Sequence, residues 1–93
     1  MGLRFSWEPR KAIRNERKHG ISYREATTAF ADPLSITIED PDHSEREHRY
    51  LLIGITALDH LVVVAHSERG NEIRLISARR ATRAEREAYE EGE

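Results

Sequence analysis

The stretch that most constrains the fold is Glu72 to Arg80, a short apolar segment with the sequence EIRLISARR. In an extended chain Ile73 and Leu75 point one way, whereas Ile76 and Ala78 point the other way, so apolar side chains occupy both faces. A strand that is apolar on both faces is typical of the interior of a sheet, because both of its faces are covered there. The sequence therefore predicts a sheet with this strand inside it.

Two adjacent arginines, Arg79 and Arg80, end this predicted strand. A guanidinium offers planar, fork-shaped donors that match phosphate oxygens, and a strand inside a sheet would hold them rigidly. We therefore predict an anion clamp that faces phosphate. Strand alternation places Arg74 on the same side as Arg80 and Arg79 on the other side, so one site is not expected to use all three. Salt bridges to the acidic loop or the acidic tail are the alternative role for these arginines.

The composition is that of a single small domain, residues 1–93. The chain has no cysteine, which excludes disulfides and thiolate zinc sites and fits a reducing compartment. Its longest apolar run, Leu61 to Ala65, is too short for a signal peptide or a membrane span. We expect a soluble cytoplasmic protein that does not contact membranes.

The net charge of -2 conceals two basic blocks. Residues 1–24 contain seven basic and two acidic residues, and residues 69–86 contain six basic and two acidic residues. The acidic residues gather instead in residues 39–47 and in the tail, residues 87–93. If the basic blocks share a face, the chain can bind a polyanion despite its near-neutral total. The alternative is that these charges only solvate helices.

Two helices are predicted before the main part of the sheet. Leu3 to Trp7 alternates like a short first strand, and a helix follows from about Glu8 to Lys18, with Pro9 at its start and Gly20 just past its end. Lys11, Arg14 and Lys18 recur at helical spacing on this helix, which predicts a basic stripe. A capping-box pattern at Ser22 and Glu25 opens the second helix, and Asp32-Pro33 ends it.

Four strands and a last helix follow. The strands are predicted at Leu34 to Ile38, Arg49 to Thr56, Leu61 to His66 and Glu72 to Arg80, with a turn at Ser67 to Asn71. The acidic loop from Glu39 to His48 is expected to be mobile. Thr82 and Glu85 form a second capping box, which opens a helix through Tyr89. The prediction is an α+β fold with a four-stranded antiparallel meander.

Several motifs in this order resemble one known family. They are Trp7-Glu8, Lys11, Asn15, the run Lys18-His19-Gly20-Ile21-Ser22, Phe30 with Asp32-Pro33, the run Ile76-Ser77-Ala78-Arg79-Arg80, Glu85 and Tyr89. Together they span nearly the whole chain and resemble BrnT-type toxins of bacterial type II toxin-antitoxin systems. The resemblance implies a RelE-like fold and a ribonuclease that inhibits translation by cutting RNA without metal. It also implies a BrnA-like antitoxin that neutralises the toxin and forms with it a complex that binds operator DNA.

Metal-free RNA cleavage needs a base for the 2′-hydroxyl, cations for the phosphate charge and an acid for the leaving oxygen. The predicted catalytic residues are Arg79, Arg80, Lys18, Arg49 and Arg69. Arg79 and Arg80 would stabilise the developing charge. Lys18 ends the basic helix, where the helix dipole favours a cation. Arg49 begins a strand and Arg69 lies in a predicted turn, so both could reach a shared surface.

The predicted RNA-binding residues are Lys11, Arg14, His19, Arg74 and Tyr89. Structural alternatives stay open for several of them. His19 could cap the last carbonyls of its helix, and Tyr89 could pack in the core with its hydroxyl at the edge. Arg74 could form a salt bridge.

No metal or other cofactor is predicted, because His43 and His48 in the acidic loop do not form a ligand pattern. His66 could be a base or a hydrogen-bonded histidine at the rim. Phe5 and Trp7 are expected to anchor the first strand to the core, although aromatic side chains can also stack on bases.

Two other functions compete with a ribonuclease. One is a nucleic-acid-binding module without catalysis, in which the basic residues only follow phosphates. The other is a docking module whose acidic tail and basic face bind a second protein. Only the enzyme predicts that one substitution can abolish cutting while RNA affinity stays nearly intact.

Overall fold

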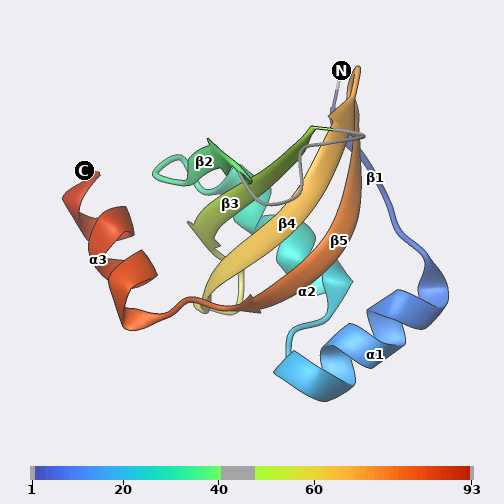
Figure 1. Cartoon of the computed structure of the whole chain (residues 1–93), viewed down its shortest axis with the longest axis horizontal. Helices are drawn as coiled ribbons and strands as arrows, with labels where there is room; N and C mark the ends of the chain where they lie inside the picture. The colour runs from blue at the N-terminus through green and yellow to red at the C-terminus, as the bar shows by residue number, and fades with distance from the viewer. Residues whose placement is uncertain (1, 41–47, 93) are drawn as a thin grey trace.

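The structure, a computed structural model, describes residues 2–40 and 48–92 and contains one five-stranded sheet with helices packed against it (Figure 1). The strand order is β1-β5-β4-β3-β2. The elements are β1 (Arg4–Ser6), α1 (Pro9–His19), α2 (Tyr23–Thr28), the 3-10 helix η1 (Ala29–Ala31), β2 (Ile36–Glu39), β3 (Arg49–Ile55), β4 (Leu61–Arg69), β5 (Glu72–Arg80) and α3 (Arg83–Glu91). The predicted α+β class and the antiparallel meander of β2 to β5 are confirmed.

Strand β5 lies inside the sheet, as predicted, because β4 pairs with it on one side and β1 on the other. The pairing with β1 is parallel and covers only residues 72–74 of β5. On the β4 side the register shifts: His66 pairs with Leu75, but the preceding Ala65 pairs with Ser77, which leaves Ile76 as an extra residue. This irregularity is a β-bulge, and it reverses the alternation of side chains along the rest of the strand.

The bulge corrects two predictions. Ile73, Leu75 and Ala78 all belong to one core cluster on one face, so the broken alternation does not mean that the two faces are equally apolar. The prediction that Arg74 and Arg80 face the same side of the sheet is also wrong. Arg74 is next to Leu75 and faces away from this cluster, whereas Arg80 pairs with Val62, which belongs to the cluster. The alternation of side chains between the two faces no longer predicts the face of a residue that lies beyond an inserted residue.

Helix α1 begins at Pro9 and ends at His19, with Gly20 just past its end, as the sequence predicts. Gly20 has φ 74°, a left-handed conformation that glycine adopts without a Cβ penalty. The buried residue of α1 is polar: Asn15 donates from Nδ2 to the carbonyl oxygens of Ala78 (2.8 Å) and Ile21 (3.0 Å), and its Oδ1 accepts from the Ala78 N–H (3.0 Å). Asn15 therefore occupies the edge of β5 beyond the end of β1, where a strand would otherwise pair.

The first sheet face is covered by α2 and η1, which lie behind the sheet in Figure 1, and its core contains Val62 and Val64. Phe5 packs edge-on against Phe30 with ring centroids 5.1 Å apart, so the predicted anchoring of the first strand is confirmed. His66 is fully buried between Phe30 and Tyr50 and is not a rim residue.

Strand β4 is longer than predicted. It continues to Arg69, and the turn to β5 consists of Gly70 and Asn71. Ser67 to Arg69, predicted to lie in a turn, are therefore strand residues. The acidic loop starts later than predicted, because Glu39 is the last residue of β2. Residues 41–47 lie outside the described residues, so the predicted mobility of this loop is not tested.

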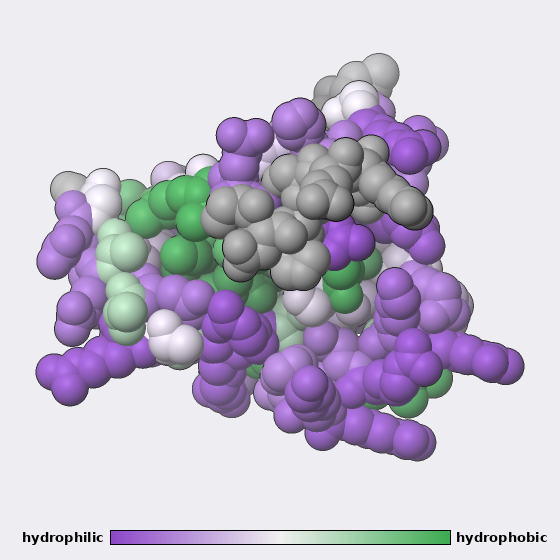
Figure 2. Space-filling view, in the orientation of Figure 1, coloured by the Kyte–Doolittle hydropathy of each residue, from purple (hydrophilic) through white to green (hydrophobic). Residues whose placement is uncertain are grey.

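Helix α3 covers one end of the second face. Tyr89 packs there with Ile53, Leu61 and Val63, and its hydroxyl donates to Asp32 Oδ2 at 2.7 Å. The predicted capping box at the start of α3 is confirmed in both directions. Beside α3 an apolar surface stays visible on this face (Figure 2). None of the described helices is long and apolar enough to cross a membrane.

Candidate active site

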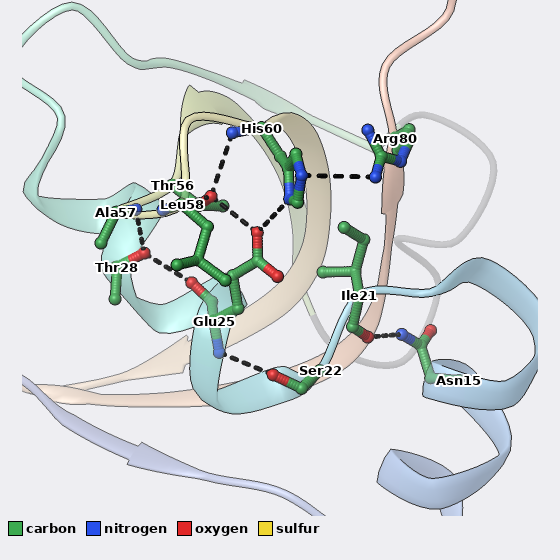
Figure 3. A network of polar contacts seen from close by, with 10 residues as sticks. All are labelled: Asn15, Ile21, Ser22, Glu25, Thr28, Thr56, Ala57, Leu58, His60 and Arg80. Carbon is green, nitrogen blue, oxygen red and sulfur yellow. Dashed lines mark hydrogen bonds and ion pairs between the residues drawn. The ribbon is translucent and has the colours of Figure 1, made fainter.

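Three side chains from three different elements meet at the end of the first sheet face: Glu25 of α2, His60 of the β3–β4 turn and Arg80 of β5 (Figure 3). His60 Nδ1 lies 2.6 Å from Glu25 Oε2, and Arg80 Nη2 lies 3.4 Å from His60 Nε2. The carboxylate is almost buried, with 8% of its side chain exposed, whereas 31% of the His60 side chain is exposed. One end of this Glu25–His60–Arg80 cluster is therefore fixed inside the protein and the other end faces solvent.

The β3–β4 turn holds His60 rigidly. Thr56 Oγ1 accepts hydrogen bonds from the backbone N–H groups of Leu58 and His60, both at 3.2 Å. The same hydroxyl donates to Glu25 Oε2 at 2.7 Å. The Ala57 N–H donates to Thr28 Oγ1 at 2.8 Å, which ties the turn to the end of α2. The carboxylate and the turn that carries the histidine are thus parts of one hydrogen-bond network (Figure 3).

The two contacts of His60 fit one neutral tautomer of its ring. A guanidinium can only donate, so the contact with Arg80 places an acceptor at His60 Nε2. The ring proton then lies on Nδ1 and points to Glu25. A carboxylate that orients a histidine in this way leaves the ring lone pair on Nε2, where a substrate hydroxyl that displaces Arg80 could give up its proton. The arrangement supplies a candidate base next to a candidate charge-stabilising cation.

A second feature is a shallow groove of about 340 Å³ between α1 and β5, which we call the α1 groove. Its lining residues are Lys11, Arg14, Asn15, Lys18, His19, Tyr23 and Ile76. The basic stripe predicted for the first helix therefore faces a concave surface. The Tyr23 hydroxyl donates to the Ile76 carbonyl at 2.7 Å, and burial, followed by the nearby Glu8 charge, raises the pKa of Tyr23.

The groove and the cluster are joined by β5. Asn15, at the base of the groove, is hydrogen-bonded to both backbone groups of Ala78, and Arg80 follows two residues later on the same strand. Residues n and n+2 of a strand share a face. The same strand therefore carries the backbone groups that hold Asn15 and, two residues later, the Arg80 side chain of the cluster.

Comparisons with known proteins decide the family. Residues 7–85 match a family model described as "Ribonuclease toxin, BrnT, of type II toxin-antitoxin system". The chain belongs to the BrnT family. The crystal structure of the Brucella abortus ribonuclease toxin BrnT is similar in fold, with a TM-score of 0.63 and 19% sequence identity over 87% of this chain and 99% of that chain. No curated protein matches the sequence.

Within this BrnT-family chain the two adjacent arginines do not form one clamp. Arg79 faces the opposite side of the sheet from Arg80 and forms a bidentate pair with Glu85 of α3, with Nη1–Oε1 and Nη2–Oε2 distances of 2.8 Å. The hydrogen bonds from Arg79 lower the pKa of Glu85 to about 2 and raise the pKa of Arg79. Arg79 thus forms a salt bridge, as in the alternative left open by the sequence, but its partner is Glu85 of α3 and not the acidic loop or the acidic tail.

The other predicted residues divide between the two faces. The α1 groove brings together Lys11, Arg14, Lys18 and His19. Arg49 and Arg74 both pair with Ser67 and face the second side of the sheet, away from the cluster. Arg69 follows Ser67 by two residues on β4 and faces the same side. These three arginines are therefore not near His60. Tyr89 is buried, and its hydroxyl is bonded to Asp32 rather than exposed to RNA.

Asp32 shows how α3 is held in this BrnT-family fold. It also accepts from the N–H groups of Leu34 (2.9 Å) and Ile55 (2.8 Å). Although burial opposes ionisation, the hydrogen bonds from Ile55, Tyr89 and Leu34 lower the pKa of Asp32. The packing alternative for Tyr89 is thus the one that the structure shows.

Sequence reasoning missed two members of the cluster. Glu25 was considered only as the last residue of a capping box, but its carboxylate turns to His60 and Thr56 while Ser22 Oγ accepts from the Glu25 N–H. His60 lies between the strands predicted at Arg49 to Thr56 and Leu61 to His66, a position that by itself predicts no catalytic role. The two residues are 35 positions apart and come from a helix and a turn, so no spacing rule connects them. The available signal was a histidine just before an apolar strand that runs antiparallel to the arginine strand.

Proposed function

We propose that this chain is a metal-independent endoribonuclease in which His60 is the general base. The position of His60 between Glu25 and Arg80 is the observation that carries the proposal. His60 Nε2 would take the proton of a ribose 2′-hydroxyl, whose oxygen would attack the adjacent phosphorus while the 5′-oxygen leaves. The products of such a step are a 2′,3′-cyclic phosphate and a free 5′-hydroxyl.

Arg80 would stabilise the negative charge that grows on the phosphate oxygens, since a fixed cation next to the reacting group lowers the barrier most effectively. Lys11, Arg14 and Lys18 would hold the neighbouring phosphates in the α1 groove. Glu25 would keep the His60 ring in the required tautomer. Each requirement of 2′-hydroxyl attack except the proton donor for the leaving oxygen is then assigned to a residue.

In a cell this activity would inhibit translation in the cytoplasm. The family description places its members in type II toxin-antitoxin systems, so we propose an antitoxin partner, BrnA-like in kind, that neutralises the chain. Binding to operator DNA is proposed only for the complex of the two proteins. A binding module without catalysis is the alternative function.

The test compares purified wild type with His60→Asn and Arg80→Ala on a fluorescent single-stranded RNA, with a chelator present throughout. His60→Asn keeps a side-chain donor for Glu25 but removes Nε2. We expect cutting to fall about 10²- to 10⁴-fold for His60→Asn and about 10²-fold for Arg80→Ala. RNA affinity should change less than about twofold for His60→Asn.

Arg86→Ala is the matched control, because Arg86 is exposed on α3, which packs on the sheet face opposite the cluster. It should cut like wild type. If folded His60→Asn cuts as fast as wild type, the assignment of the base is wrong. If wild type binds RNA but never cuts it, the binding module is the better description.

A further inference from the structure

Cross-strand pairing arranges the side chains of the second sheet face in rows, and three of these rows lead from α3 toward the basic end of the sheet. The row under α3 contains Ile36, Ile53, Val63 and Arg79; the middle row contains Ile38, Leu51, Ala65 and Ser77; and the third row contains Arg49, Ser67, Arg74 and Ser6. Directly paired residues share a face, so each row runs across the sheet. The chemistry changes from apolar to basic as one moves away from α3.

The middle row forms an apolar strip that the described chain leaves partly open. Ile53 and Val63 in the first row are 6% and 2% exposed, but Ile38 in the middle row is 48% exposed. Leu51, Ala65 and Ser77 are half-buried. Figure 2 shows apolar surface on this side of α3. Aliphatic surface that stays open beside a helix can accept a second apolar element.

A cavity of about 390 Å³ adjoins this strip at the basic end. Its described lining residues are Ser67, Arg69, Glu72 and Arg74. The Glu72 carboxylate accepts a hydrogen bond from Ser6 Oγ at 2.8 Å. Within residues 2–40 and 48–92, neither Arg69 nor Arg74 has an ion pair with a carboxylate. Among the described residues, two guanidinium groups and one carboxylate line this cavity, which is an excess of positive charge.

We infer that this face docks a partner protein through an amphipathic segment, whose apolar side chains cover the middle row and whose carboxylates pair with Arg69 and Arg74. The charge of the cavity selects carboxylates, and arginine binds them in a bidentate manner. Apolar cores bordered by arginine are also typical of protein interfaces. The surface lies on the sheet face opposite His60, so the inference does not depend on the proposed catalytic role of that residue.

RNA fits this face less well than a protein segment does. The middle row is aliphatic and contains no aromatic ring on which a base could stack. The phosphate-binding residues of the α1 groove and the arginines of this cavity also lie on different sides of the sheet. A second copy of this chain, whose α3 ends in Glu90 and Glu91, is the other competing occupant.

The probe is a fluorescein-labelled 18-residue helical peptide with leucines on one stripe and glutamates beside it. A matched peptide has lysine in place of each glutamate. Binding to the full-length chain is measured by anisotropy. We expect the glutamate peptide to bind at least about tenfold more tightly, and Arg69→Glu and Arg74→Glu each to weaken it about tenfold or more. Ile38→Asp should weaken both peptides, since it places a charge in the apolar strip.

Arg86→Glu is the matched control, with the same change of charge on the exposed side of α3, and should change affinity less than about twofold. Thermal unfolding confirms that each variant is folded. Equal binding of the two peptides, or an Arg74→Glu variant with wild-type affinity, would overturn the inference. So would a loss of single-stranded RNA binding in Arg69→Glu and Arg74→Glu, or a dimer that Ile38→Asp dissociates, because the occupant would then be RNA or a second copy.

Discussion

His60 owes its proposed role to two neighbours rather than to its own position. Glu25 fixes one ring nitrogen from α2, and Arg80 lies beside the other at the end of β5. A ring held in this way is already oriented, which reduces the reorganisation that proton transfer requires. Thr56 contributes by bonding to the same Glu25 oxygen and to the His60 backbone.

Glu25→Gln tests this orientation. The amide keeps the size of the side chain but removes the negative charge that favours the Nδ1–H tautomer. We expect cutting to fall on the order of 10²-fold or more, with RNA affinity nearly unchanged and with the pH profile of cutting altered. Rates of single-turnover cleavage across pH measure this effect. Glu16→Gln, on the exposed side of α1, serves as the control, and an unchanged rate in Glu25→Gln would contradict the positioning role.

The Arg79–Glu85 pair has a structural consequence that depends on pH. Because the pKa of Glu85 is lowered from 4.5 to about 2 in the folded chain, its charge stabilises the fold fully above about pH 5. This contribution is lost as the pH falls from about 5 toward 2. Arg79 is partly exposed, so solvent reduces the stabilisation to about 1–2 kcal/mol.

Glu85→Gln should therefore lower the free energy of unfolding by about 1–2 kcal/mol at pH 7 and have little effect near pH 2, while the glutamine still caps α3. Urea unfolding at pH 7, 4 and 2.5 measures the difference. Glu87→Gln, on an exposed position of α3, is the comparison variant. A loss of equal size at every pH would show that the charge of Glu85 is not the cause.

At the scale of elements, the junction of α1 with β5 matters most. Helix α1 has little apolar contact with the sheet, and Asn15 replaces that contact with three hydrogen bonds to buried backbone groups. A buried amide whose donors and acceptor are all satisfied specifies one register between helix and strand. The α1 groove keeps its position relative to Arg80 for this reason.

Asn15→Ala should lower the free energy of unfolding by about 2–4 kcal/mol, because it leaves backbone groups of Ala78 and Ile21 buried without partners. Urea unfolding measures this loss. Asn71→Ala, in the exposed β4–β5 turn, is the control and should change stability by less than about 0.5 kcal/mol. A loss below about 1 kcal/mol in Asn15→Ala would mean that apolar contacts dock α1 instead.

At the scale of the whole molecule, the sheet separates two positively charged surfaces. One contains the α1 groove and Arg80, and the other contains Arg69 and Arg74. A net charge of -2 therefore does not describe what either surface presents to a ligand. If the first surface binds RNA and the second binds protein, a partner can occupy the chain without covering the proposed catalytic cluster.

The salt dependence of RNA binding tests this separation. Four cations, Lys11, Arg14, Lys18 and Arg80, give an expected slope of log affinity against log salt of about -2 to -3 for single-stranded RNA. Lys18→Gln should make the slope shallower by about 0.7, whereas Arg74→Gln should leave it unchanged. Fluorescence anisotropy of the His60→Asn variant between 50 and 200 mM salt measures the slope. Equal effects of the two substitutions would mean that RNA contacts both surfaces.

The sequence by itself determined the class of fold, the limits of α1 and the two capping positions. These features depend on neighbours within a few residues: Pro9 and Gly20 bound a helix through their own backbone preferences, and Thr82 and Glu85 cap α3 across three positions. The basic stripe of α1 follows from helical periodicity in the same way. The resemblance on which the family depended also came from short motifs in order along the chain.

Tertiary structure decided which residues meet. The bulge at Ile76 separates Arg74 from Arg80, and no local signal in the apolar run distinguishes an inserted residue from a change of covered face. Arg79 is bound to Glu85 and Arg80 approaches His60 because adjacent residues of a strand point to opposite faces, each of which packs against a different helix. The Glu25–His60 contact joins residues 35 positions apart. Such contacts are fixed only when the sheet brings its covering helices and turns together.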